Sequence, residues 1–275
     1  MVTIVVLVAS MSLVFILIHD LVTQIAYFRL KNLVISGLQR LSTEQIRKQT
    51  DIHHGINLLS INLSLVRKRL LVHPWIAEAT VNREIPNEIH VSIREHIPLA
   101  VVDLGRKYLI SDRGIIFKEK EISDPDNLPI VRGLRYSDIN ISGENNRSWF
   151  KKNRLPSAGA PSRSGSKNVN SYPLNAVMEI LHLGQKKGSI LPNHRIKQIR
   201  IDRDIGLTLY PLDTVREIKL GYNDFSSKYD VLRKVLMYIK TGKIKNFADF
   251  DSIDLNNLNR VVLHPIKPAK DHKEV

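Results

Sequence analysis

Two short motifs contain the residue types that nucleophilic catalysis requires. Ser164 and Lys167 have the S-x-x-K spacing, and Lys240-Thr241-Gly242 forms a K-T-G triplet. That chemistry needs the serine at the start of a buried helix and the triplet on a strand beside the same pocket. Ser164 lies instead in a segment rich in Ser, Asn, Gly and Pro, and Gly242 follows an amphipathic pattern as a helix-capping glycine. No S-D-N element lies between the motifs, so the sequence argues against an enzyme.

Candidate metal ligands are equally incomplete. Asp249, Asp251 and Asp254 lie close together, but the glycine and glutamate that an EF-hand loop adds at fixed offsets are missing. His53 and His54 are adjacent, so in a strand their side chains face opposite ways. The chain has no cysteine and no glycine-rich nucleotide-binding motif. We therefore predict no metal site and no cofactor.

The charge balance predicts a polyanionic neighbour. The chain carries 41 Lys and Arg against 27 Asp and Glu, a formal net charge of +14. Nucleic acid, anionic lipid and an acidic envelope polymer all fit this charge, but no nucleic-acid-binding motif is present. Six of the basic residues lie in 143–173, a segment with one acidic residue and few apolar ones. We predict a flexible basic insert there, able to contact an anionic envelope polymer or lipid.

The first 27 residues predict an uncleaved transmembrane anchor. Residues 2–18 carry no charge and continue into further apolar residues, which is enough to span a bilayer as a helix. No basic n-region or small-residue cleavage site supports a signal peptide. Arg29 and Lys31 follow the run, which by itself would keep the bulk of the chain in the cytoplasm. We expect the natural chain to begin upstream of Met1, which would remove this conflict.

Residues 28–97 have the pattern of a small α+β domain. A short strand at 31–37 precedes a helix whose Ser42 and Gln45 have capping-box spacing. A second helix begins at Asn62 or Ser64 and ends before Pro74. Two alternating strands follow as a hairpin, one with Ala77, Ala79 and Val81 on a shared face, the other with Ile89, Val91 and Ile93. The predicted order is therefore strand, helix, helix, strand, strand (β-α-α-β-β).

Residues 98–266 predict a mainly antiparallel β domain with flanking helices. Strands at 99–134 include a turn at Asp112-Arg113-Gly114. After the basic insert we expect a helix, three strands, a helix at 227–240 and two final strands. Residues 267–275 are charged and predict a disordered tail. The whole chain is thus of the α+β class behind an N-terminal transmembrane helix.

The chain resembles a known family of bacterial division proteins. The β-α-α-β-β unit behind one anchor is similar to a POTRA domain, and the sequence around it resembles the FtsQ/DivIB family. The matching features are a strand that ends in Gly37, then Pro74-Trp75, Arg83 with Pro86, Glu95 with Pro98-Leu99-Ala100, and Asp112-Arg113-Gly114 with Phe117. Residues 174–266 resemble the C-terminal β domain of that family.

The resemblance implies a scaffold without catalysis. It implies a single-pass protein of the bacterial cytoplasmic (inner) membrane, with its C-terminal bulk extracytoplasmic, enriched at the division septum. Such a protein links early and late division proteins, and its partners are small single-pass proteins like FtsB and FtsL together with other members of the divisome. A POTRA-bearing component of outer-membrane protein assembly or secretion is the alternative, and an envelope-polymer binder is a third hypothesis.

The resemblance places a partner-binding edge at about residues 250–264. A strand at the edge of a sheet can pair with a partner strand. The residues predicted to bind the partner are Ser252, Asp254, Arg260, Val262 and Leu263. Asp254-Leu255 is followed by Asn256-Asn257, where the family often has an arginine and an aromatic residue. Inward packing of Val261 and Leu263 is the simpler interpretation of this strand, and the pattern does not choose between the two.

Overall fold

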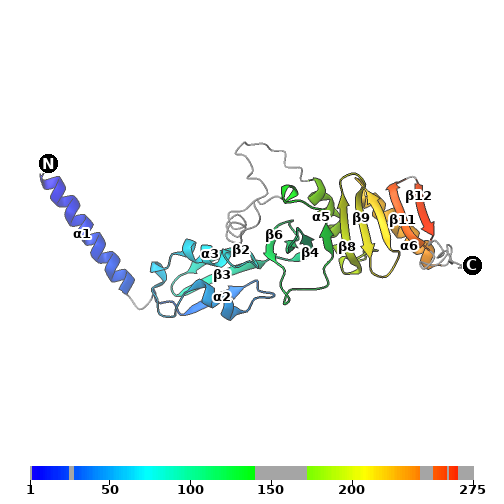
Figure 1. Cartoon of the computed structure of the whole chain (residues 1–275). Coiled ribbons are helices and arrows are strands. Elements are labelled where there is room, and N and C mark those ends of the chain that lie inside the picture. The colour runs from blue at the N-terminus through cyan, green and yellow to red at the C-terminus, as the bar shows by residue number, and fades with distance from the viewer. Residues whose placement is uncertain (1, 25–27, 140–171, 242–249, 259, 266–275) are drawn as a thin grey trace, which may run out of the picture. The chain divides into compact units, whose positions relative to one another are not determined.

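The computed structural model describes residues 2–24, 28–139, 172–241, 250–258 and 260–265, and the chain divides into two compact units, Met1–His96 and Ile97–Val275. Figure 1 shows the elements of each unit along the chain. Most of the predicted basic insert and the predicted tail lie outside the described residues, as do Ser164, Lys167 and Gly242.

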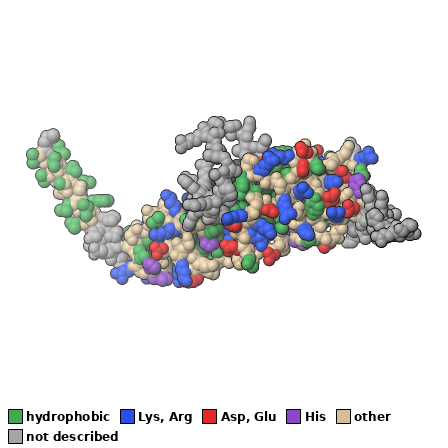
Figure 2. Space-filling model, in the orientation of Figure 1, with side chains coloured by type: hydrophobic (Ala, Val, Ile, Leu, Met, Phe, Trp, Pro, Cys, Tyr) green, Lys and Arg blue, Asp and Glu red, His purple; other side chains and the backbone are tan. Residues whose placement is uncertain are grey.

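The predicted N-terminal helix is present as α1 (Val2–Gln24). Its described apolar side chains are exposed, as the hydrophobic surface along α1 in Figure 2 shows. Among the described residues, no helix meets the combined length and apolarity that crossing a membrane requires.

The first unit has the predicted β-α-α-β-β order. Its elements are β1 (Asn32–Ser36), α2 (Thr43–Thr50), the 3-10 turn η2 (Leu58–Ser60), α3 (Leu63–Leu71), β2 (Ile76–Glu84) and β3 (Glu88–Glu95). The three strands form one sheet in the order β1-β3-β2, with β1 parallel and β2 antiparallel to β3. Apolar side chains of α2 and α3 share a buried cluster with those of the sheet, so one sheet face is covered and the other is wet.

Local sequence chemistry sets the helix ends of this unit. The Ser42 hydroxyl accepts from the backbone N–H of Gln45 at 3.2 Å, and the Gln45 side chain accepts from the N–H of Ser42 at 2.8 Å. This is the predicted capping box. Of the two predicted caps for α3, Asn62 is the one used, since its side chain accepts from the N–H of Leu65.

The hairpin differs from its prediction at one position. Ile89, Val91 and Ile93 are buried on one face as expected. On β2, however, Ile76 is buried together with Ala79 and Val81, while Ala77 is only half-buried. The register between β2 and β3 shifts between Ile76 and Glu78, and such an irregularity inverts the side-chain alternation on one side of it. The prediction for Ala77 was therefore wrong because strict alternation ignores bulges.

A buried carboxylate closes the turn between β1 and α2. Glu95, 8% exposed at the end of β3, accepts backbone N–H groups from Gln39 and Leu41 through Oε1 (2.9 and 3.1 Å) and from Arg40 through Oε2 (2.9 Å). Gly37 precedes this turn with φ +84°, and a Cβ there would lie 1.9 Å from the carbonyl oxygen of Ile93. Glycine is thus required for β1 to reach the end of β3.

The second unit is built on a nine-stranded sheet. Its elements are β4 (Pro98–Asp103), β5 (Lys107–Ser111), β6 (Ile116–Glu119), β7 (Ile130–Arg132), η3 (Tyr136–Asp138), α5 (Tyr172–Gln185), η4 (Asn193–Arg195), β8 (Ile196–Asp202), β9 (Gly206–Pro211), β10 (Glu217–Gly221), α6 (Phe225–Lys240), β11 (Phe250–Asn257) and β12 (Arg260–Pro265). The order across the sheet is β12-β11-β10-β9-β8-β7-β4-β5-β6. Three neighbouring pairs are parallel, β10/β11, β4/β7 and β7/β8, and the other pairs are antiparallel. The expected mainly antiparallel β domain is therefore confirmed.

The two α-helices that the described part of this unit contains belong to its core. Val177, Ile180 and Leu181 of α5 are fully buried, and Phe225 and Leu232 of α6 join them in the cluster that includes the sheet. Helix α5 begins at Tyr172, so the last two residues of the predicted flexible insert are helical. Pro173 fits that position, because the first turn of a helix does not need its N–H.

Candidate protein-interaction edge

The sheet of the second unit ends at β12. Within the part of the chain that the structure describes, β12 pairs with β11 and has no strand on its other side. Ser252 lies opposite His264, Ile253 opposite Leu263 and Asp254 opposite Val262. A terminal strand directs alternate N–H and C=O groups away from the sheet, which makes it a template for a further strand.

The five residues predicted to bind a partner fall on two strands. Arg260, Val262 and Leu263 lie on β12, where the main chain borders the open edge. Ser252 and Asp254 lie on β11, which is paired on both sides, with β10 and with β12. The backbone of Ser252 and Asp254 therefore lies between two neighbouring strands. These two residues can contact a partner only through their side chains.

Ser252 and Asp254 on β11 differ in how exposed their side chains are. Ser252 is 4% exposed, so little of it reaches the surface. Asp254 is half-buried, and its Oδ1 accepts the backbone N–H of Asn256 at 2.8 Å. This bond belongs to the bulge between Asp254 and Asn257. The side chain of Asn256 in turn lies against Gly221, where an added Cβ would approach its Oδ1 to 1.9 Å.

The side chains of β12 alternate between the core and the opposite face. Val261 and Leu263 are partly buried and pack against the core of the unit, so the inward packing considered in the sequence is present. Arg260 is exposed, and Val262 is half-buried on the other face. The inward packing of Val261 and Leu263 leaves the main chain of β12 at the edge, so inward packing and edge pairing are compatible.

Ion pairs lie on and beside β10 and β11, the strands behind this edge. Lys219 of β10 pairs with Glu217 at 3.2 Å, and Arg216 approaches Asp251 at 3.7 Å. Figure 2 shows basic and acidic side chains interspersed over the second unit. The Arg216–Asp251 pair is exposed and Lys219–Glu217 is half-buried, and ion pairs open to solvent contribute little to stability, so the edge is positioned mainly by backbone pairing and the apolar core.

A buried lysine, missed in the sequence, fixes α6 to the neighbouring strand. Lys228 is 3% exposed, and its Nζ donates to the carbonyl oxygens of Leu220 (2.7 Å) and Tyr222 (2.6 Å) at the end of β10. Burial lowers the pKa of Lys228, whereas the charges of Asp224 and Asp254 oppose that shift. The signal was present in the sequence, since Lys228 lies on the apolar stripe of Phe225, Tyr229 and Leu232.

The described residues offer no arrangement for nucleophilic catalysis at the K-T-G triplet. The Thr241 hydroxyl donates to the carbonyl oxygens of Met237 and Tyr238, so it ends α6. A cavity of about 220 Å³ lies beside the N-terminal ends of α5 and α6, lined by apolar and aromatic residues with Asp202 and Arg203. Its lining contains no serine, histidine or lysine, so it lacks a nucleophile with a base.

Comparisons with known proteins cover both units. Residues 28–96 match the family described as POTRA domain, FtsQ-type, and residues 100–256 match the family described as Cell division protein FtsQ/DivIB, C-terminal. The second match ends before β12.

Curated relatives agree with these matches. The chain is 25% identical over 237 residues to the cell division protein FtsQ of Syntrophotalea carbinolica, covering 86% of this chain and 74% of the relative. It is 23% identical over 250 residues to FtsQ of Geotalea daltonii, covering 90% and 80%. Cell division protein DivIB of Clostridium tetani is 28% identical over 134 residues, covering 46% and 50%. The match of both units to the family models and the relatives along most of the chain together show that this protein belongs to the FtsQ/DivIB family of cell-division proteins.

Proposed function

We propose that this protein is a non-enzymatic scaffold of the divisome, which links early and late division proteins at the septum by binding them directly. The observation that carries the proposal is the position of β12 at the end of a nine-stranded sheet. A partner segment in extended conformation adds there as a tenth strand. Main-chain hydrogen bonds supply affinity, and the side chains of β12 supply specificity.

The chemistry of β12 defines the kind of segment it accepts. Val262 and Arg260 lie on the face away from the core, so a partner strand gains an apolar neighbour and a cationic one on that face. Val261 and Leu263 lie on the core face, where the partner would extend the apolar layer. We infer an extended segment with alternating apolar residues and an acidic residue opposite Arg260, as a small single-pass protein of the FtsB or FtsL kind could provide.

We propose that α1 anchors the protein in the cytoplasmic membrane with both units on the extracytoplasmic side. The support is compositional, because residues 2–18 contain no charged side chain. Small single-pass partners would then be confined to the same membrane, which raises their effective concentration at the edge without any additional contact.

Depletion of the protein in its own host tests the divisome role. We expect long, smooth filaments with segregated nucleoids, because septum formation stops while growth continues. Wild-type protein supplied from a plasmid should restore normal cell length. Normal septation accompanied by misassembled outer-membrane proteins would contradict the proposal and favour the secretion alternative.

A further inference from the structure

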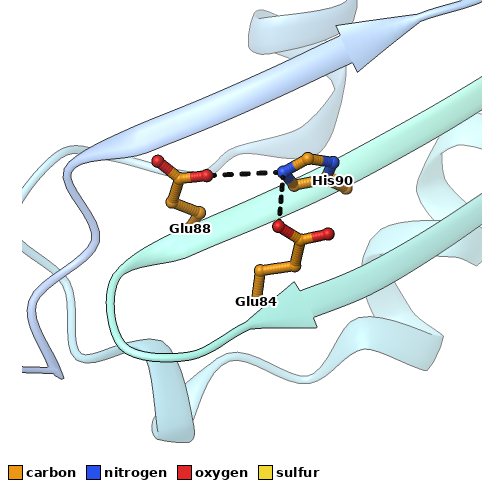
Figure 3. Close-up of side chains that lie close together, drawn as sticks. All are labelled: Glu84, Glu88 and His90. Atoms are coloured by element: carbon orange, nitrogen blue, oxygen red, sulfur yellow. Dashed lines mark hydrogen bonds and ion pairs between the residues drawn. The ribbon is translucent and has the colours of Figure 1, made fainter.

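Three titratable side chains meet on the wet face of the hairpin in the first unit. The Nε2 of His90 lies 3.1 Å from Oε2 of Glu84 and 3.4 Å from Oε2 of Glu88. Figure 3 shows the two carboxylates approaching the same ring nitrogen, Glu84 from β2 and Glu88 from β3. The potential ligand atoms of all three residues lie within 4.8 Å of one another.

The strand register places these residues together. Glu84 lies directly opposite Glu88 across the hairpin, and His90 follows Glu88 by two residues and so shares its face. Ile89 and Val91 point to the opposite, buried face. The side chains of Glu84, Glu88 and His90 are 58%, 32% and 38% exposed, so an ion from solvent can reach them.

The third strand of the sheet orients one of the carboxylates. Asn32 of β1 lies beside Glu88 in the parallel register, and its Nδ2 donates to Oε1 of Glu88 at 2.6 Å. This leaves Oε2 of Glu88 directed at His90. A hydrogen bond of this kind to the outer oxygen is how proteins fix a carboxylate that ligates a metal.

The carboxylates of Glu84 and Glu88 face each other across the hairpin, and a positive charge between them would stabilise this arrangement. Like charges directly opposite in adjacent strands destabilise the pair. The imidazole of His90 carries at most one positive charge, whereas a divalent cation offsets both carboxylates. The imidazole nitrogen disfavours Ca²⁺ and Mg²⁺, which prefer oxygen ligands, and favours a metal such as Zn²⁺, which binds imidazole and carboxylate together.

The distances agree with a zinc ion. Zinc bonds of about 2.0–2.1 Å in a tetrahedron hold neighbouring ligand atoms about 3.4 Å apart. The His90–Glu84 and His90–Glu88 contacts of 3.1 and 3.4 Å are close to that value. Three protein ligands leave the fourth position for water or for a ligand from another protein.

We propose that Glu84, Glu88 and His90 form a Zn²⁺ site on the solvent-facing side of the POTRA hairpin, with Asn32 positioning Glu88 from the adjacent strand. The sequence alone does not reveal this site, because the pairing of β2 with β3 is what brings the three ligands together. Zinc bound there joins the two strands next to their turn, so it stabilises the folded first unit, and the stabilisation grows with the logarithm of the free zinc concentration above Kd.

Zinc titration of the full chain in mild detergent tests the site. Metal-free protein is titrated with ZnCl₂ in competition with a chromophoric chelator, and folding of every variant is checked by circular dichroism. Glu84→Gln and His90→Gln should each weaken binding at the site by more than tenfold, and Asn32→Ala should weaken it by about tenfold. Glu78→Gln is the matched control, since Glu78 lies on the same strand and face and pairs with Arg94.

Thermal unfolding adds an independent measurement. Zinc should raise the melting temperature of the wild type and of Glu78→Gln but not that of His90→Gln. Equal zinc affinity in the wild type and His90→Gln would place the ion elsewhere and overturn the proposal. A wild-type chain that binds no zinc would leave the cluster as side-chain contacts alone and would overturn the proposal as well.

Discussion

A proline at a β12 position whose N–H points away from β11 should abolish partner capture while the second unit stays folded. Proline removes the donor, and its ring projects into the space that the added strand must occupy. The combined loss of about 3 kcal/mol corresponds to about 100-fold weaker binding. Co-purification of the division partners with tagged full chain from host membranes measures the effect.

The register limits the choice to two sets of positions. Asp254 opposite Val262 and Ser252 opposite His264 show that Val262 and His264 have the same backbone orientation, while Leu263 between them has the other. Val262→Pro and Leu263→Pro therefore form a matched pair. The proline at the position whose N–H bonds to β11 removes that hydrogen bond and lowers the melting temperature. The proline at the position whose N–H faces outward leaves the β11–β12 hydrogen bonds intact and should remove partner binding alone.

Val262→Thr is the control for this pair, because it keeps the N–H and the β-branched shape. It should capture far more partner than a proline variant that blocks the edge, with a loss limited to the apolar contact of the Val262 side chain. Wild-type recovery of partner with both proline variants would contradict strand addition at β12, whatever the melting temperatures show.

Glu95→Ala should destabilise the first unit by about 3 kcal/mol, because it removes a carboxylate that accepts three backbone N–H groups. These bonds hold the turn between β1 and α2 against the end of β3. Glu95→Gln should lose less, since its amide keeps one oxygen acceptor. The turn also carries Arg40, whose guanidinium lies 4.3 Å from the centroid of the Trp75 ring, so its loosening should alter that tryptophan.

Urea unfolding followed by Trp75 fluorescence measures this change. The chain has two tryptophans, so a Trp149→Phe background restricts the signal to the first unit. Glu78→Ala, which removes an exposed carboxylate paired with Arg94, is the control and should cost at most about 1 kcal/mol. A Glu95→Ala midpoint equal to that of Glu78→Ala would show that the carboxylate does not hold the turn.

The elements of this fold could be predicted because their determinants are local. The Ser42–Gln45 capping box, the Asn62 cap and the alternation of Ile89, Val91 and Ile93 depend on residues within a few positions of each other. Burial of Trp75 likewise follows from its apolar ring. The prediction that Ala77 shares the buried face was wrong, because the register shift between Ile76 and Glu78 depends on how β2 pairs with β3.

The candidate sites were harder to predict because they depend on which strands become neighbours. Alternation at 250–265 indicated two strands, but it could not show that Ser252 and Asp254 lie on a strand paired on both sides. Likewise the burial of Lys228 is explained only by the carbonyl groups at the end of β10 that accept its hydrogen bonds. Both the neighbours of β11 and the partners of Lys228 depend on the strand order, and that order arises from tertiary packing.

Hydrogen–deuterium exchange on the full chain, alone and with its co-purified small single-pass partner, tests the central claim most directly. Strand addition predicts that the outward-facing amides of β12 exchange freely in the isolated protein and become strongly protected in the complex. Amides of β12 that bond to β11 should change much less. Unchanged exchange along β12, with new protection confined to other elements, would contradict the account and move the partner site away from this edge.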